Sequence, residues 1–131
     1  VTPGELSARF NFRYSTEWTH ESLQKKVESV FDAHAIDYEL RWHLSGKPFL
    51  TEPGKLINAV AQAVTEHTGQ SPELSTGGGT SDGRFISPAG VDVVELGPVN
   101  ASIHKINEHV KVDDVIALTS MYKRIIELML L

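Results

Sequence analysis

The sequence contains no cysteine, which excludes disulfide bonds and thiolate metal sites. Any metal ion would therefore have to be bound by histidine, aspartate or glutamate. The sequence is also poor in positive charge, with 12 lysines and arginines against 17 aspartates and glutamates and a net charge of -5. Because phosphate binding needs a basic surface, this balance argues against nucleic acid as a partner and favours a small molecule or a protein.

Long apolar runs are absent as well. No run approaches the roughly 20 residues of a membrane span, and the N-terminal "VTPGELSARF" lacks the apolar core of a secretory signal. We therefore expect a cytoplasmic protein that does not contact a membrane. Val1 stands where a starting methionine would, and a strand pattern begins almost at once, so we expect a piece of a longer protein.

Two periodicities are present in the first third of the chain. Apolar side chains alternate over 5–14 and again over 36–44, which predicts two strands. Between them the spacing becomes helical, with Thr19 as the N-cap and an end near Ala35. Strand, helix and strand make half of a small α+β sandwich, and its open edges predict self-association through this segment.

The segment "SGKPFLTEPGK" (45–55) is rich in glycine and proline and predicts a boundary between packing units. Beyond it, a helical pattern starts near Leu56 and stops at Gly69, and the apolar run 91–96 predicts a buried strand of the parallel type. The last helix is expected over 113–130, capped by Asp113. Its core-facing residues are expected to be Val115, Ile116, Leu118, Tyr122, Ile125, Ile126 and Met129. The fold class predicted is α/β (mixed α+β).

The loop "STGGGTSDGRF" (75–85) has three consecutive glycines, which suit a positive φ or a close approach of a ligand to the main chain. Thr80 is expected to begin a short helix whose free N–H groups favour an anion, and Arg84 offers a fork for a carboxylate. The spacing fits neither a P-loop nor a dinucleotide-binding loop. A flexible turn is the alternative interpretation.

The loop "GPVNASIHKINEH" (97–109) concentrates polar side chains after a predicted buried strand. In open α/β sheets, ligands bind at such loops. His104 lies in a compact turn and is a better candidate metal ligand than His109, which flanks the last helix. A solvated or hydrogen-bonding histidine is the alternative.

Four segments together carry a family resemblance: "PGELSARFNFRYSTE", "LSGKPFLTEPGKL", "TGGGTSDGRFI" and "VVELGPVNASIHKINEHV". They resemble the C-terminal part of dizinc amidohydrolases of the M20 family, which are related to aminoacylase and carboxypeptidase, and the resemblance extends along essentially the whole chain. It implies that 1–48 is the second half of a ferredoxin-like lid or dimerisation domain. It implies that 49–131 is the last part of a zinc-peptidase-like α/β catalytic domain.

The resemblance also implies an activity. "GGGTSDGR" and "NASIHKINE" are similar to members that hydrolyse N-succinyl-LL-2,6-diaminopimelate, in the synthesis of lysine and cell-wall precursors, and differ from the related acetylornithine deacetylases. These members use two zinc ions per subunit and act as homodimers. By the same resemblance His104 is a zinc ligand, and the substrate-binding residues are Arg13, Ser45, Gly46, Gly79, Thr80, Arg84 and Asn100.

Other motifs of the family are missing from this sequence. It has no HxD metal motif, no counterpart of the bridging aspartate and no Asp-Glu-Glu run with the general base. The resemblance therefore implies that the remaining zinc ligands and the catalytic glutamate lie outside this chain, which alone would be inactive. Two alternatives stay open: a deacylase of another N-acyl amino acid in the same family, and a non-catalytic dimerisation module.

Overall fold

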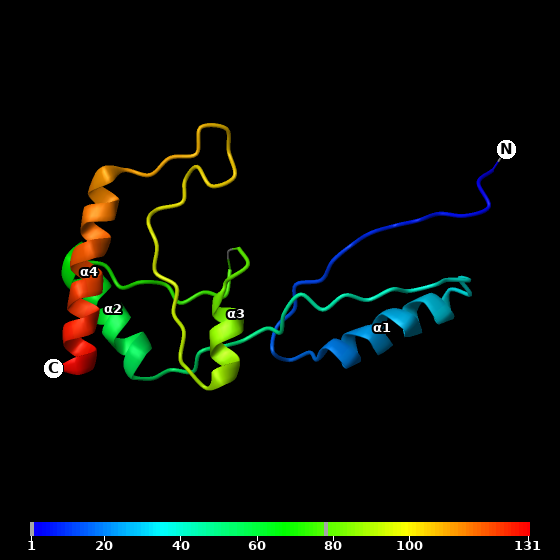
Figure 1. The fold of residues 1–131 in the computed structure, drawn as a ribbon, viewed down its shortest axis with the longest axis horizontal. Coiled ribbons are helices and arrows are strands. Elements are labelled where there is room, and N and C mark those ends of the chain that lie inside the picture. Colours follow the sequence, from blue (N-terminus) through cyan, green and yellow to red (C-terminus); the bar gives the residue numbers. More distant parts are fainter. Residues whose placement is uncertain (1, 78) are drawn as a thin grey trace. The chain divides into compact units, whose positions relative to one another are not determined.

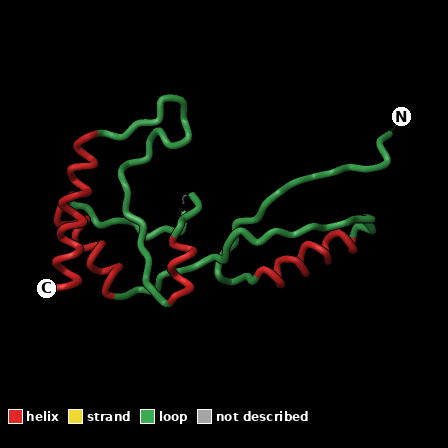
Figure 2. Tube along the Cα trace, viewed as in Figure 1, coloured by secondary structure: helices red, strands yellow, loops and turns green. Residues whose placement is uncertain are grey.

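The computed structural model describes residues 2–77 and 79–131, and it divides the chain into two compact units, Val1–Leu50 and Thr51–Leu131. Figure 1 shows the order of the elements along the chain, and Figure 2 separates helices from loops. The division falls inside the glycine- and proline-rich segment 45–55. The assignment of the two units to a lid domain and a catalytic domain stays a prediction.

The first unit contains one helix, α1 (His20–Ala33). Thr19 caps it as predicted: its hydroxyl accepts a hydrogen bond from the Ser22 amide, and the Ser22 hydroxyl accepts one from the Thr19 amide. This reciprocal pair satisfies two amide donors that the first turn leaves free. After the helix Ala35 adopts a positive φ of 51°. No residue of α1 is fully buried, although Leu23, Val27 and Phe31, spaced four positions apart, are half-buried.

The strands predicted over 5–14 and 36–44 are not confirmed. Both segments run as loop, and Figure 2 draws no strand among the described residues. Within the part of the chain that the structure describes, no backbone hydrogen bond joins the two segments. They meet instead through aromatic rings, because Phe12 stacks on Trp42 at 6.1 Å between centroids. Alternating apolar and polar side chains indicate a segment that can form a strand. A ladder of backbone hydrogen bonds also needs a neighbouring strand to pair with.

The second unit is built on two helices, α2 (Lys55–Thr68) and α4 (Val112–Leu130), which lie side by side (Figure 1). Ala59, Val60 and Ala63 of α2 and Ile125 of α4 form the buried core of this pair. The small alanine side chains let the two helix backbones approach closely. The predicted stop at Gly69 is confirmed, since this residue ends α2 with a φ of 72° that glycine adopts without steric cost.

The prediction for α4 is right in its extent and wrong in two details. Its N-cap is Lys111, and Asp113 lies within the first turn, where its carboxylate favours the helix dipole without capping. The buried positions are Met121 and Ile125. Four residues expected in the core are instead exposed at fractions of 47% to 60%: Val115, Ile116, Tyr122 and Ile126. These residues lie on the side of α4 that α2 does not cover.

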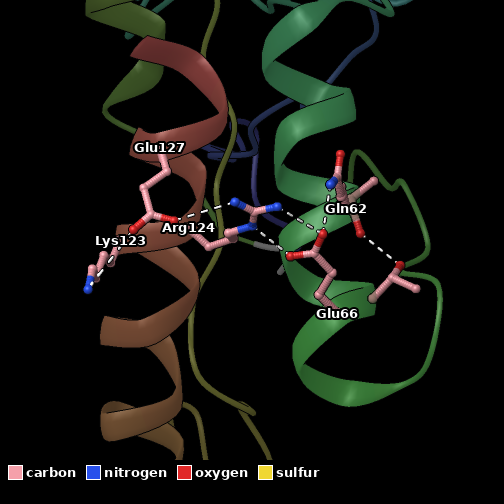
Figure 3. Close-up of polar contacts among 7 residues, drawn as sticks. Gln62, Glu66, Lys123, Arg124 and Glu127 are labelled. Carbon is pink, nitrogen blue, oxygen red and sulfur yellow. Dashed lines mark hydrogen bonds and ion pairs between the residues drawn. The ribbon is translucent and has the colours of Figure 1, made fainter. Parts of the chain in front are cut away.

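An ion pair joins the same two helices (Figure 3). Arg124 of α4 donates from Nε and Nη2 to the two carboxylate oxygens of Glu66 on α2, at 2.7 and 3.2 Å. Gln62 donates a further hydrogen bond to Glu66 at 2.7 Å. These donors, Arg124 first, lower the pKa of Glu66 from its ordinary value of 4.5 to about 2. Glu127 approaches Arg124 from its other side at 3.4 Å.

The segment 91–96 was predicted as a buried strand, and the structure assigns no strand there. Its position is nevertheless fixed by the helices, because Val94 and Leu96 pack on the core and Tyr122 of α4 donates a hydrogen bond to the Leu96 carbonyl at 2.6 Å. The Thr51 hydroxyl bonds to both the amide and the carbonyl of Val93. The α/β arrangement is thus not observed, since no neighbouring strand pairs with this segment in the described part of the chain.

Two short elements complete the second unit, α3 (Gly83–Ile86) and the 3-10 turn η1 (Ser87–Ala89). They follow the glycine-rich loop and precede 91–96 in the chain. None of the helices in the described ranges has the length and apolar character needed to span a bilayer.

Candidate functional site

The glycine-rich loop leads into α3, but the helix begins later than predicted. Its first residue is Gly83 rather than Thr80, and the Ser81 hydroxyl accepts a hydrogen bond from the Gly83 amide at 2.9 Å. Thr80 itself is exposed in the loop. A helix of 4 residues presents little dipole, so the expected anion site at a helix N-terminus is not supported.

The glycines of the loop differ in what their surroundings require. A Cβ on Gly77 would lie 3.1 Å from the Ser75 hydroxyl, which also accepts a hydrogen bond from the Gly77 amide. Gly79 lies in open space and is not among the residues with positive φ. Gly78 lies outside the described residues. The expected need for a positive φ is therefore not found at Gly77 or Gly79, and only Gly77 is constrained by a close neighbour.

Arg84 is the cation of this region. It lies on α3, half-buried, with its guanidinium 4.6 Å from the centre of the Phe85 ring. Its Nε is buried and has no hydrogen-bond partner among the described residues. A buried donor without a partner is costly, and a planar guanidinium suits a carboxylate that approaches with two oxygens. The side chain is thus available to bind an anionic group.

The second loop, 97–111, follows 91–96 and bends back on itself before α4 (Figure 1). Asn100 and His104 are both exposed there. His104 has a positive φ of 59° and Asn107 one of 62°, a conformation that residues other than glycine rarely adopt. The His104 amide donates to the Glu108 carboxylate at 3.4 Å. The imidazole ring of His104 makes no hydrogen bond with the described residues, so both ring nitrogens remain available.

Ser102 is a feature of this loop that the sequence analysis missed. It is 8% exposed, and its hydroxyl donates to the His109 carbonyl at 2.8 Å and accepts from the His109 amide at 3.0 Å. A serine two positions before a candidate ligand carries no distinctive pattern. Its role becomes visible only once the fold brings residues seven apart into contact.

The remaining predicted site residues lie in the first unit. Arg13 is exposed and donates to the Asn11 side chain at 3.1 Å. Ser45 is exposed and Gly46 half-buried in the loop that ends this unit. Arg13 therefore presents a charged group to solvent, held by a single local hydrogen bond.

The donors present can be compared with what zinc requires. A neutral imidazole with a free nitrogen fits one position of a tetrahedral zinc site. Among the described residues, no group of three or more histidine, aspartate or glutamate side chains is placed to bind a metal ion. His104 thus fits as a single ligand, and further ligands would have to come from other residues. No hydrogen bond between described residues links 79–84 with 100–104.

A shallow hollow of about 390 Å³ lies elsewhere, along α2 and the segment 71–74. Its walls include Ile57, Ala61 and Leu74, and its polar groups include Glu66, which Arg124 already binds. None of the predicted substrate or metal residues lines this hollow. The two loops of the second unit thus remain the candidate site that the sequence predicts.

Comparisons with known proteins find close relatives, and the three described below have the same name. The chain is 58% identical over 130 residues to a succinyl-diaminopimelate desuccinylase of Nitrosococcus oceani, which covers 99% of this chain and 35% of that protein. Proteins of the same name are 56% identical in Thioalkalivibrio sulfidiphilus, over 99% of this chain and 35% of the relative, and in Methylococcus capsulatus, over 96% and 33%. The chain thus spans about a third of the length of these curated relatives.

A family model provides the second comparison. The model described as Peptidase family M20/M25/M40 matches residues 2–128, which include both candidate loops and both structural units. A match over nearly all of the chain confirms the family resemblance seen in the sequence. The chain belongs to Peptidase family M20/M25/M40.

Proposed function

We propose that this chain is part of a zinc-dependent amidohydrolase that converts N-succinyl-LL-2,6-diaminopimelate and water to succinate and LL-diaminopimelate. In this reaction the amide C–N bond breaks, the succinyl carbonyl gains the hydroxyl of water, and the amine gains its proton. The observation that carries the proposal is the 53% to 58% identity to proteins named for this reaction, over almost the entire chain. Both candidate loops lie within the matched residues.

His104 is proposed as a ligand for one of the zinc ions. Zinc, when bound, supplies an activated water and polarises the scissile carbonyl. The support from this chain is an exposed imidazole whose ring nitrogens are free of hydrogen bonds to the described residues, on a turn held at positive φ. A ligand held on a fixed turn loses little conformational freedom when it binds the metal.

The substrate carries carboxylates at both ends, one on the succinyl group and two on the amino-acid groups, beside one free ammonium group. Arg84 supports its binding, because a half-buried guanidinium with an unpartnered Nε can donate to a carboxylate. Arg13 is proposed to bind a second carboxylate. Four further exposed or half-buried residues are proposed to supply hydrogen bonds or close main-chain contacts: Ser45, Gly46, Gly79 and Thr80. Asn100 is proposed to donate from its amide.

The fold of the longer protein is also a proposal. We infer that 1–48 belongs to a lid or dimerisation domain of ferredoxin-like type and that 49–131 belongs to an α/β catalytic domain. Two observations support further covering layers: the stacked Phe12 and Trp42 in unpaired extended segments, and the exposed apolar side of α4. A helix with apolar residues on more than one side is typical of packing against more than one neighbour. A homodimer formed through the first domain belongs to the same proposal.

The test is turnover of N-succinyl-LL-2,6-diaminopimelate by the full-length protein with added zinc, compared with its His104→Ala variant. We expect the variant to lose at least about a hundredfold in kcat/KM, since a missing ligand weakens the metal site. His67→Ala is the matched control, because His67 lies exposed in the last turn of α2 and belongs to neither loop. It should retain full activity.

Other outcomes separate the alternatives. Turnover of an N-acetyl amino acid in place of the succinyl substrate would assign a different deacylase. Turnover by the 131-residue chain alone would contradict the proposal that essential ligands lie outside it. A full-length protein that is silent on every acyl substrate but dimerises in sedimentation would favour the dimerisation module.

A further inference from the structure

We propose that Ser102 is the positioning residue that holds the turn carrying His104 in the conformation needed for metal binding. This inference rests on the proposed function, because it assumes that His104 is a metal ligand. Among the described residues, Ser102 is the only buried residue with a polar side chain. Its two hydrogen bonds both go to the backbone of His109, one as donor and one as acceptor.

These two bonds close a loop of eight residues, 102–109, at its base. A serine hydroxyl can donate one hydrogen bond while accepting others, so it satisfies the amide and the carbonyl of His109 together. His109 itself is exposed, but both bonds are part-buried, so water would replace a lost partner only in part. Replacement of Ser102 by alanine would remove the side-chain partner of both His109 groups and would loosen the base of the loop.

The interior of the loop depends on this closure. His104 and Asn107 both have positive φ, and such residues persist only where the surroundings hold them. The Lys105 amide donates to the Ser102 carbonyl at 3.0 Å, and the Lys105 ammonium donates to the Ala101 carbonyl at 2.9 Å. Both bonds span His104, because they run from Lys105 on one side of it to Ser102 and Ala101 on the other.

The hydrogen bond that His104 itself makes with the described residues is long in comparison. Its amide donates to the exposed Glu108 carboxylate at 3.4 Å, which is long for a hydrogen bond. The Ser102 hydrogen bonds are shorter, at 2.8 and 3.0 Å, and part-buried. The direction of the His104 imidazole is thus governed by Ser102, whose hydroxyl makes its hydrogen bonds to the backbone of His109 and not to the imidazole. It acts through the backbone.

The experiment uses the full-length protein with three variants: Ser102→Ala, which removes the hydroxyl; Ser102→Thr, which keeps it; and Ser71→Ala as the control. Ser71 is exposed in the segment after α2 and makes no side-chain hydrogen bond to the loop 102–109 among the described residues. Three readouts are taken for each. They are the zinc dissociation constant from chelator competition, the visible spectrum of the cobalt(II)-loaded protein, and the hydrogen-exchange rate of the loop amides. Thermal unfolding monitors the overall fold.

We expect Ser102→Ala to weaken zinc binding by 10- to 100-fold, the usual effect of losing a group that orients a ligand, and to change the cobalt(II) spectrum. Exchange of the His109 amide should accelerate while the midpoint of unfolding changes little. Ser102→Thr should keep the wild-type spectrum, and Ser71→Ala should match the wild type in every readout.

Each contrary result has a distinct meaning. Unchanged exchange in Ser102→Ala would overturn the closure of the loop by the hydroxyl. Faster exchange with unchanged zinc affinity and cobalt(II) spectrum would overturn its role in positioning. Loss of affinity in both the alanine and the threonine variants would point to packing and overturn the role of the hydroxyl. His104→Ala is measured in parallel: if it binds zinc as the wild type does, the proposed function of His104 fails, and the inference about Ser102 falls with it.

Discussion

Helices α1 and α2 have the same length of 14 residues but differ in what they bury. α1 begins with a complete capping box and has no buried residue, whereas α2 lacks a side-chain cap and buries Ala59, Val60 and Ala63. The first helix is therefore defined by local hydrogen bonds, and the second by its contact with α4. Local signals can fix where a helix starts, but only a second packed surface supplies the burial that stabilises it.

The same contrast applies to the side chains around the helices. In the first unit, aromatic rings pack against one another, such as Phe31 and Tyr38 at 5.0 Å, but none of the described residues of this unit is fully buried. In the second unit the core is extended by Leu56, Val94 and Leu96 and bridged by the pair of Glu66 and Arg124. The comparison predicts that equal substitutions will have unequal effects in the two units.

The largest difference is expected from an alanine-to-aspartate change in each helix. Ala63 of α2 is 1% exposed, so Ala63→Asp places a carboxylate between α2 and α4 and should lower the free energy of unfolding by about 3 kcal/mol or more. Ala33, the last residue of α1, is exposed, and Ala33→Asp should cost about 0.5 to 1 kcal/mol, from the helix dipole. Urea unfolding followed by circular dichroism measures both. Equal losses would contradict the contrast between the units.

A smaller effect is expected at the helix caps. Here the substitution in the first unit should cost more than the one in the second unit. Thr19→Ala removes the reciprocal bonds with Ser22 and should cost about 1 kcal/mol, seen as loss of α1. Lys111→Ala at the N-cap of α4 should cost much less, because this residue makes no side-chain cap bond. Hydrogen exchange of the first-turn amides distinguishes the two helices. A larger effect at Lys111 would show that α4 depends on its cap rather than on packing.

The smallest effect is expected from the surface ion pair, and it depends on pH. The folded pKa of Glu66, about 2, lies below its ordinary value of 4.5, so the unfolded chain takes up its proton first as the pH falls. The stabilisation is fully present above about pH 4.5 and is lost as the pH decreases toward 2. Glu66→Gln should therefore lower the unfolding midpoint slightly at pH 7, and this difference should shrink at low pH.

The control for that measurement is Glu73→Gln. Glu73 is exposed and takes part in none of the ion pairs between described residues. Its substitution should leave the midpoint unchanged across the range. High salt should reduce the effect of Glu66→Gln as well, since the pair is partly exposed and open to screening. A difference that grows at low pH would contradict the role of the pair with Arg124.

The sequence allowed good prediction of the helices because their signals are local. The spacing of apolar residues, the cap at Thr19 and the glycine at position 69 all act within a few residues, and the structure confirms each. The N-cap of α4 was misplaced by two residues, at Asp113 instead of Lys111, since an acidic residue is favourable both at a cap and in the first turn. An aspartate at position 113 is therefore compatible with both roles, as N-cap and as first-turn residue.

Strands and faces were predicted less well, because they depend on distant partners. The alternating segments lack paired neighbours in the described chain, so they form no ladder of backbone hydrogen bonds. Ile125 and Ile126 are adjacent and chemically identical, yet one is 8% exposed and the other 58%. Which of them faces α2 is decided by the angle at which the helices meet. The candidate site shows the same division: the motifs of the two loops predict His104 and Arg84 as site residues, which stays a prediction, and they do not indicate Ser102.

The sequence by itself determined the helices, the family and the residues to which a site could be assigned. These depend on neighbours in the chain or on sequence motifs shared with relatives. The tertiary structure alone decided that Arg124 binds Glu66, that α4 leaves one apolar side open, and that Ser102 closes the loop of His104. Each of these joins residues through space. The free energy of such contacts depends on distance, direction and exclusion of water, and the order of residues in the chain does not specify these quantities.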